Sequence, residues 1–199
     1  MCILFIFNGE KEAESDYSLI LISNRDEYYE RPSQNMAPWS EDNSVYGGRD
    51  LQPGCKTGTW LAISTKYKKI GVLLNLPGVK KENAISRGSI VADYVTNDLN
   101  LLDYVECIKE DANKYNDFVF VSVELGYLPD PQLENRQPNI YKELSSIFVK
   151  IPVIKYGTRA HTIILVTKSG HVDLIEISMK SPIDVENTQW ERNEFHFNI

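Results

Sequence analysis

The sequence has few cysteines and no long hydrophobic run, and both shortages exclude classes of protein. Its three cysteines, Cys2, Cys55 and Cys107, are odd in number and widely spaced, so they indicate neither a disulfide framework nor a paired-cysteine zinc site. No segment reaches the ~18 apolar residues of a membrane-spanning helix. The short apolar opening also lacks the basic flank of a signal peptide. We therefore expect a soluble, cytoplasmic chain in a reducing compartment.

Positive charge is scarce as well. The chain has 21 Lys and Arg residues against 28 Asp and Glu residues, a net charge of −7. Because phosphate binding needs a concentrated basic surface, we do not expect nucleic acid as a partner. The short basic clusters at 66–69 and 80–81 are typical of solvated turns. Hydrophobic residues at 42% and charged residues at 25% are ordinary for a globular protein, and residues 1–199 fit a single domain.

Hydrophobic periodicity predicts a mostly antiparallel α/β fold. Helical spacing predicts one helix that begins at an N-cap Ser86 and a second helix over 101–108. Residues 28–56, rich in proline and glycine, are expected to be irregular, as is 126–139, and 140–149 is ambiguous. The strands are expected at 2–7, 17–23, 59–64, 70–75, 118–123, 162–167 and 172–177, with an edge strand over 190–197.

The first two strands are expected to pair as a hairpin. If Phe7 lies opposite Ser18, antiparallel pairing puts Cys2 opposite Ser23. The polar residues that follow Ser23 then reach the thiol. Because both strands are continuously apolar, we expect each face of their sheet to be covered.

Cys2 is a candidate nucleophile, because removal of Met1 would place its thiol and a free α-amine on one residue. The amine, with a pKa of roughly 7.7–8.0, can act as the base. Arg25 would lower the thiol pKa and Asp26 would orient the amine. Asn24 or Asn75 could donate to an oxyanion. The structural alternatives are a small buried Cys2 that opens a core strand and an Arg25–Asp26 ion pair that stabilises a turn.

Other polar residues give weaker signals. Arg159 could aim a second cation at the same pocket, although a surface arginine is the ordinary alternative. The three histidines, at 161, 171 and 196, share no metal-ligand spacing, so we expect no metal site. Any one of them, or Cys2, could formally ligate haem iron, but a single residue of this kind carries little specificity.

Several short motifs together resemble a known family. The chain is similar to the NRDE-motif family of transport and Golgi organisation protein 2 homologues, over residues 1–123 and 154–197. The motifs are Met1-Cys2, Asn24-Arg25-Asp26-Glu27, Gly48-Arg49-Asp50-Leu51, Gly58-Thr59-Trp60-Leu61, Ser86-Arg87-Gly88, and Tyr156-Gly157-Thr158-Arg159 with Thr162. The family is similar to N-terminal nucleophile hydrolases, which implies a four-layer α-β-β-α sandwich. Cys2 matches the nucleophile position, and Asn24, Arg25 and Asp26 match the motif beside it.

The resemblance implies a trafficking or homeostasis factor with a hydrolase-like pocket. Family members are associated with Golgi organisation and secretion, haem mobilisation and acyl-coenzyme A homeostasis, in the cytoplasm, Golgi and mitochondrion. The implied partners are haem or an acylated metabolite, with transient membrane contact and no required cofactor. Two alternatives stay open: an amidase or thioesterase that acts through Cys2, and a purely structural interaction module.

The chain departs from the family pattern in its middle. Relatives continue after the strand at 118–123 with a further hairpin and helices, whereas this chain passes directly to Gly126-Tyr127-Leu128-Pro129. We therefore expect an internal deletion near 124–128. It would remove sheet strands, covering helices and an asparagine that could donate to an oxyanion.

Overall fold

The structure is a computed structural model that describes residues 2–9, 14–55, 58–123, 150–151 and 155–199. The chain divides into two compact units, and each is described by itself. The first comprises Met1–Arg31 and Lys142–Ile199, and the second comprises Pro32–Tyr141. The expectations for 126–139 and 140–149 lie outside the described residues, and the single domain with an internal deletion stays a prediction.

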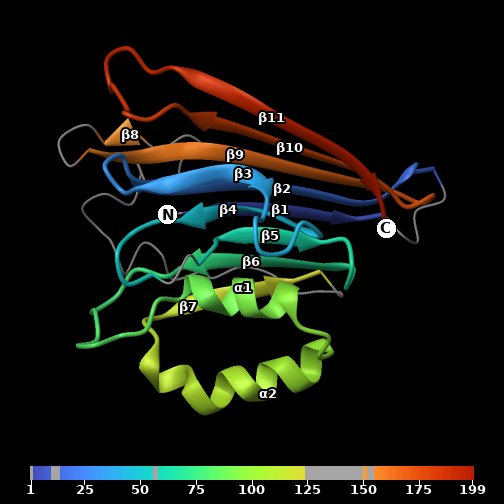
Figure 1. Ribbon diagram of the computed structural model, residues 1–199, viewed down its shortest axis with the longest axis horizontal. Helices are drawn as coiled ribbons and strands as arrows, with labels where there is room; N and C mark the ends of the chain where they lie inside the picture. The colour runs from blue at the N-terminus through green and yellow to red at the C-terminus, as the bar shows by residue number, and fades with distance from the viewer. Residues whose placement is uncertain (1, 10–13, 56–57, 124–149, 152–154) are drawn as a thin grey trace. The chain divides into compact units, whose positions relative to one another are not determined.

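The first unit is built on a six-stranded antiparallel sheet. The order is β1-β2-β9-β10-β11, with β8 paired to β9 (Figure 1). The predicted hairpin of β9 and β10 and the predicted edge strand β11 are both confirmed. The strands are β1 Ile3–Asn8, β2 Tyr17–Tyr28, β8 Lys150–Ile151, β9 Tyr156–Thr167, β10 His171–Met179 and β11 Trp190–Asn198.

The two faces of this sheet differ in exposure. Leu21, Ile164 and Leu174 lie on one face and are fully buried, and we call it the buried face. On the other, which we call the exposed face, Phe5 and Ile22 are 49% and 37% accessible to solvent. The expectation that both faces are covered is therefore wrong for β1 and β2, because continuous hydrophobicity does not by itself supply a covering element.

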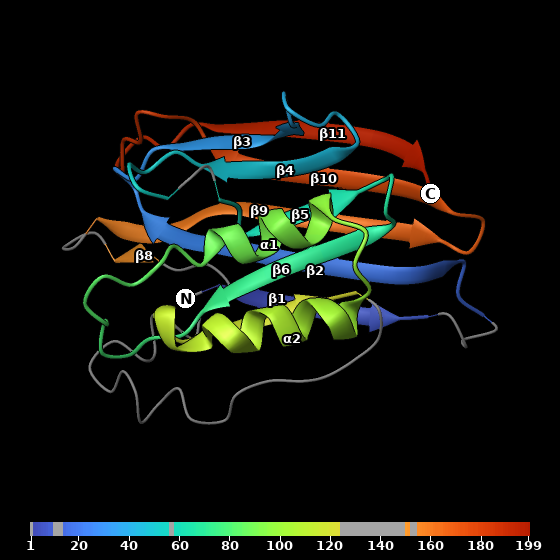
Figure 2. The ribbon, with the colours of Figure 1, turned by 60° about the horizontal axis from the view of Figure 1, so that its bottom comes forward.

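Within its described residues, the second unit is built on a five-stranded antiparallel sheet in the order β3-β4-β5-β6-β7, with two α-helices. Helix α1 packs on β5 and β6 (Figure 2), and α2 is followed by a short 3-10 helix, Ala112–Lys114. The strands are β3 Ser33–Pro38, β4 Val45–Asp50, β5 Leu61–Ser64, β6 Lys69–Asn75 and β7 Phe118–Ser122, and the helices are α1 Gly88–Thr96 and α2 Leu101–Asp111.

The expectation of an irregular stretch over 28–56 is wrong, because this stretch contains β3 and β4. Pro38 closes β3, an edge strand, where proline is tolerated. The glycines of β4 are packing positions and not a turn: a Cβ on Gly48 would lie 2.3 Å from the ring of Trp60, and one on Gly47 would lie 2.9 Å from Ala62. These two positions of β4 therefore need glycine, because neighbouring side chains occupy the space that a Cβ would fill.

The helices cover the second sheet through aromatic and branched side chains. Tyr94 of α1 is fully buried in the core, and Tyr104 of α2 donates a hydrogen bond of 2.6 Å to the carbonyl oxygen of Ile90. The predicted N-cap Ser86 is wrong by one residue, because the cap position is Arg87, whose side chain makes no cap hydrogen bond. In α2, Asn100 caps the helix by accepting from the Asp103 amide.

Over the part of the chain that the structure describes, the fold is thus mixed α/β, strand-rich, with two antiparallel sheets and few helices, as predicted at that level. The finer expectation of an N-terminal nucleophile hydrolase-like sandwich stays a prediction. In the described part of the chain, no helix is both long and apolar enough to cross a membrane.

Candidate functional site

The pairing of β1 with β2 brings Cys2 to the polar end of β2. Ile3 lies opposite Asn24 and Leu4 opposite Ser23, so Cys2, one residue earlier, lies at the level of Arg25. The predicted register, with Cys2 opposite Ser23, is therefore wrong by two residues. A shift of two keeps every side chain on its face. Cys2 therefore lies next to the motif at the end of β2, as predicted, although opposite a different residue.

The Cys2 thiol lies in an environment that favours its neutral form. Burial raises its pKa above the ordinary value, and the Asp26 carboxylate raises it further. Arg25 lowers the pKa, as expected, and so does a hydrogen bond from the Asp26 backbone N–H to the sulfur, but both are smaller effects. In the chain that retains Met1, the thiol is therefore protonated at neutral pH.

Asp26 is a buried carboxylate held by β9. The Thr158 hydroxyl donates to its Oδ1 at 2.6 Å, and the Tyr156 hydroxyl donates to its main-chain oxygen at 3.3 Å. Asp26 and Thr158 are both buried. A charge-assisted hydrogen bond of this length fixes the carboxylate beside the thiol.

Arg159 occupies an irregularity in the pairing of β2 with β9. Arg25 lies opposite Ala160, whereas Asp26 lies opposite Thr158, so Arg159 is an extra residue with no cross-strand counterpart. Its guanidinium is buried, and Nη1 donates to the carbonyl oxygens of Tyr28 at 3.1 Å and Arg31 at 2.6 Å. Arg159 is thus not a surface arginine, and these bonds hold the backbone that leaves β2.

Asn24 lies on the opposite face from Arg25, because side chains alternate along a strand. Its Oδ1 is 3.1 Å from Nδ1 of His161, the residue directly across on β9. The His161 ring stacks on Trp190, with ring centroids 5.8 Å apart. Burial lowers the pKa of His161, so this imidazole is neutral at pH 7. Asn24 is therefore tied to a pair of rings on the exposed face.

Asn75, the other predicted oxyanion donor, belongs to the second unit. It ends β6, opposite Phe118 of β7, and is exposed. Its predicted role as an oxyanion donor stays a prediction.

A buried polar row on the first sheet was missed by the sequence reasoning. Ser23, Thr162 and Glu176 lie side by side across β2, β9 and β10, on the same face as Arg25. The Thr162 hydroxyl donates to Oε2 of Glu176 at 3.4 Å, and Glu176 is fully buried. The signal was present in β10, where alternation from Val172 and Leu174 places Glu176 on the buried face.

Comparison with known proteins gives concordant matches. The model of the family described as Transport and Golgi organisation 2 matches residues 1–128 and 126–181. Transport and Golgi organization protein 2 of Drosophila melanogaster is 31% identical over 261 residues, covering 90% of this chain and 92% of that protein. The homologues of Mus musculus and Homo sapiens are each 26% identical, over 278 and 280 residues, covering all of this chain and 99% of each relative.

The alignments are longer than the chain itself, which has 199 residues. The mammalian relatives therefore contain residues that have no counterpart here. The likeness nevertheless includes both units and the motif residues of β2 and β9. The chain belongs to the transport and Golgi organisation 2 family.

Proposed function

We propose that the chain serves transport and Golgi organisation by carrying a small apolar ligand, haem or an acylated metabolite, on the exposed face of the first sheet. Family membership supports the role in transport and Golgi organisation. The observation that supports ligand carriage is an apolar strip on β1, β2 and β9. We define the apolar strip as Phe5, Ile22 and Ile163 in one cross-strand row and Phe7, Ile20 and Leu165 in the next.

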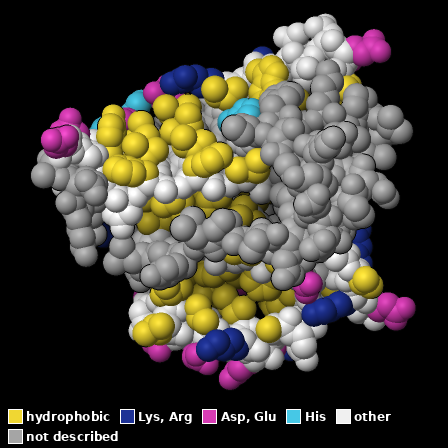
Figure 3. Space-filling model, turned by 180° about the vertical axis from the view of Figure 1, so that it is seen from behind, with side chains coloured by type: hydrophobic (Ala, Val, Ile, Leu, Met, Phe, Trp, Pro, Cys, Tyr) yellow, Lys and Arg dark blue, Asp and Glu magenta, His cyan; other side chains and the backbone are white. Residues whose placement is uncertain are grey.

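The apolar strip exposes large side chains without interruption by charge. Phe5, Phe7 and Ile22 are 49%, 42% and 37% accessible, and residues directly opposite on neighbouring strands share a face. Hydrophobic side chains also gather in bands on the face drawn in Figure 3. Exposed, contiguous apolar surface of this kind marks a site for a ligand or partner.

The row adjoining the apolar strip supplies polar groups. Asn24 follows Ile22 by two residues on β2, and His161, directly opposite Asn24, precedes Ile163 by two residues on β9, so both share the face of the apolar strip. Burial keeps His161 uncharged. An apolar surface that ends in a neutral imidazole and an amide suits a ligand with an apolar body and a polar end. For haem as the cargo, the neutral His161 would be the axial ligand from this face.

Binding by variants tests this proposal. We expect Phe5→Ser and Ile22→Ser to weaken binding of haem or of a fluorescent acyl-coenzyme A about 5- to 10-fold, because each removes apolar contact area. Leu102→Ser is the matched control, since Leu102 is 77% exposed but lies on α2 of the second unit. His161→Ala separates the cargoes, because it should change the haem spectrum and leave acyl binding intact. Equal binding by all variants would refute ligand carriage on the apolar strip.

The alternative is a hydrolase that acts through Cys2, favoured by the placement of the thiol beside Asp26. Removal of Met1 would put a free α-amine on Cys2, and the ammonium group that forms when this amine takes a proton would stabilise the thiolate. The amine would take the thiol proton, and the thiolate would attack the carbonyl to form an acyl-enzyme thioester. The leaving amine or thiol would take that proton, and water would then release the acid.

Intact mass and Cys2 variants separate the two proposals. A carrier retains function in a complementation assay when Cys2 is replaced by Ala or Ser. A hydrolase loses function in both variants, shows loss of Met1 by intact mass, and is labelled at residue 2 by an electrophilic acyl probe. Retained Met1 together with unchanged complementation would exclude the covalent mechanism.

A further inference from the structure

The hairpin of β10 and β11 gathers two imidazoles and a carboxylate at one place on the exposed face. Asp173 lies directly opposite His196, and His171 lies two residues before Asp173 on the same face of β10. These residues come from two consecutive strands, and it is the pairing register that brings His196 opposite Asp173, so spacing along the chain does not reveal them. The strand register fixes their backbones with respect to one another.

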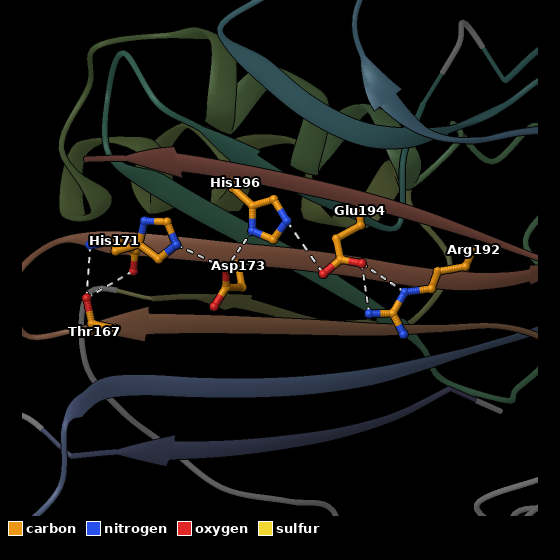
Figure 4. A network of polar contacts seen from close by, with 6 residues as sticks. All are labelled: Thr167, His171, Asp173, Arg192, Glu194 and His196. Carbon is orange, nitrogen blue, oxygen red and sulfur yellow. Dashed lines mark hydrogen bonds and ion pairs between the residues drawn. The ribbon is translucent and has the colours of Figure 1, made fainter.

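The donor atoms converge on a single carboxylate oxygen (Figure 4). Oδ1 of Asp173 is 2.7 Å from Nδ1 of His196 and 3.1 Å from Nε2 of His171. One ligand atom from each residue lies within 4.8 Å of the other two. The two imidazole rings are nearly parallel, with 8° between their planes.

We propose that His171, Asp173 and His196 bind a divalent transition metal ion of the Zn²⁺ class. Two imidazole nitrogens and one carboxylate oxygen suit Zn²⁺, Ni²⁺ or Cu²⁺ and are not the all-oxygen set that Ca²⁺ and Mg²⁺ prefer. Three protein ligands leave coordination positions for water or an exogenous ligand. Each residue is partly accessible to solvent, so an ion can enter. On binding, the metal ion would replace the hydrogen bonds between the two imidazoles and Asp173, and the imidazole protons at those positions would be released.

Neighbouring groups support the ligands. Oε1 of Glu194 is 3.5 Å from Nε2 of His196, the ring nitrogen turned away from Asp173, and Arg192 binds the other oxygen of Glu194 at 2.8 Å. A carboxylate behind a metal-binding imidazole orients the ring and increases its basicity. The amide of His171 donates to the Thr167 hydroxyl at 3.0 Å, which fixes the start of β10.

Metal titration of the full chain tests this proposal, which does not depend on the proposed function. After treatment with a chelator, we expect the protein to bind one equivalent of Zn²⁺ in competition with a chromophoric chelator. His171→Ala, His196→Ala and Asp173→Asn should each weaken binding at least about 10-fold, and Glu194→Gln should weaken it less. Circular dichroism of each variant verifies that the fold is intact.

Two further measurements identify the ligands. The triple variant Cys2→Ser, Cys55→Ser and Cys107→Ser is the matched control. It removes every thiol that could compete for Zn²⁺ and should keep full affinity, because the proposed site has no cysteine ligand. Nitrogen hyperfine coupling in the electron paramagnetic resonance spectrum of the Cu²⁺ form should be lost in the double variant of His171 and His196. The site is refuted by absence of metal binding, or by undiminished binding in that folded double variant.

Discussion

Replacement of Thr158 by Val should destabilise the first unit more than the same replacement at Thr162. Both threonines are buried on β9, and both donate to a carboxylate. The Thr158 bond to Asp26 is 2.6 Å long, whereas the Thr162 bond to Glu176 is 3.4 Å long. Hydrogen bonds between oxygens are normally about 2.5–3.0 Å long, so the Thr162 contact is the weaker one. A hydrogen bond contributes about 0.5–1.5 kcal/mol, rising to about 1.5–3 kcal/mol for a strong bond to a charged group.

The assay is equilibrium unfolding in urea, combined with hydrogen exchange of peptides from β2 and β9. We expect Thr158→Val to lower the free energy of unfolding by about 2 kcal/mol and Thr162→Val by about 1 kcal/mol or less. Val preserves the shape of the side chain, so the difference reports the hydroxyl. Faster exchange in β2 should accompany the Thr158 variant. Equal losses in the two variants would refute the argument that Asp26 is held by this short bond.

Three further predictions concern the thiol and the second unit. In the chain that retains Met1, alkylation of Cys2 by iodoacetamide should become fast only above the ordinary thiol pKa of 9.0. Asp26→Asn should shift this pH profile to lower pH, since it removes a charge that raises the thiol pKa. A pH profile that does not move in this variant contradicts the prediction. Gly48→Ala should cost about 1–3 kcal/mol in urea unfolding, because its Cβ would overlap an indole ring at 2.3 Å, whereas Gly78→Ala, with its nearest contact at 3.5 Å, should cost little. Lys69→Met should lower the free energy of unfolding by about 2–4 kcal/mol, because the buried ammonium donates to three carbonyl oxygens at the end of α1 and beyond it. Unchanged stability by calorimetry would refute this role of Lys69.

The strands were predictable where alternation and β-branched residues agreed, and less so where packing decided. The hairpins of β1 with β2 and of β9 with β10 follow from short apolar segments. The register of the first hairpin could not be predicted in the same way, because a shift of two residues leaves every side chain on the same face of the sheet. β3 and β4 were missed because their prolines and glycines are typical of loops. In the structure, these glycines admit neighbouring side chains.

The candidate site was predictable only in the part that is contiguous in sequence. Asn24, Arg25 and Asp26 stand together at the end of an apolar strand, so their proximity to Cys2 followed from one hairpin. Thr158 and His161 contact this segment from more than 130 residues away. No local pattern specifies that β2 pairs with β9, so these partners could be identified only from the fold.

The alternation of side chains along β2 has a consequence for mutagenesis of the family motif. Asn24 and Arg25 are neighbours in sequence, yet their side chains lie on opposite faces of the sheet. Asn24 contacts His161 on the exposed face, and Arg25 lies on the buried face, as Glu176 does. Replacing one of them therefore removes different contacts from replacing the other. Variants of Asn24 and Arg25 therefore need separate biochemical readouts, one for the contact with His161 and one for the charge near Cys2.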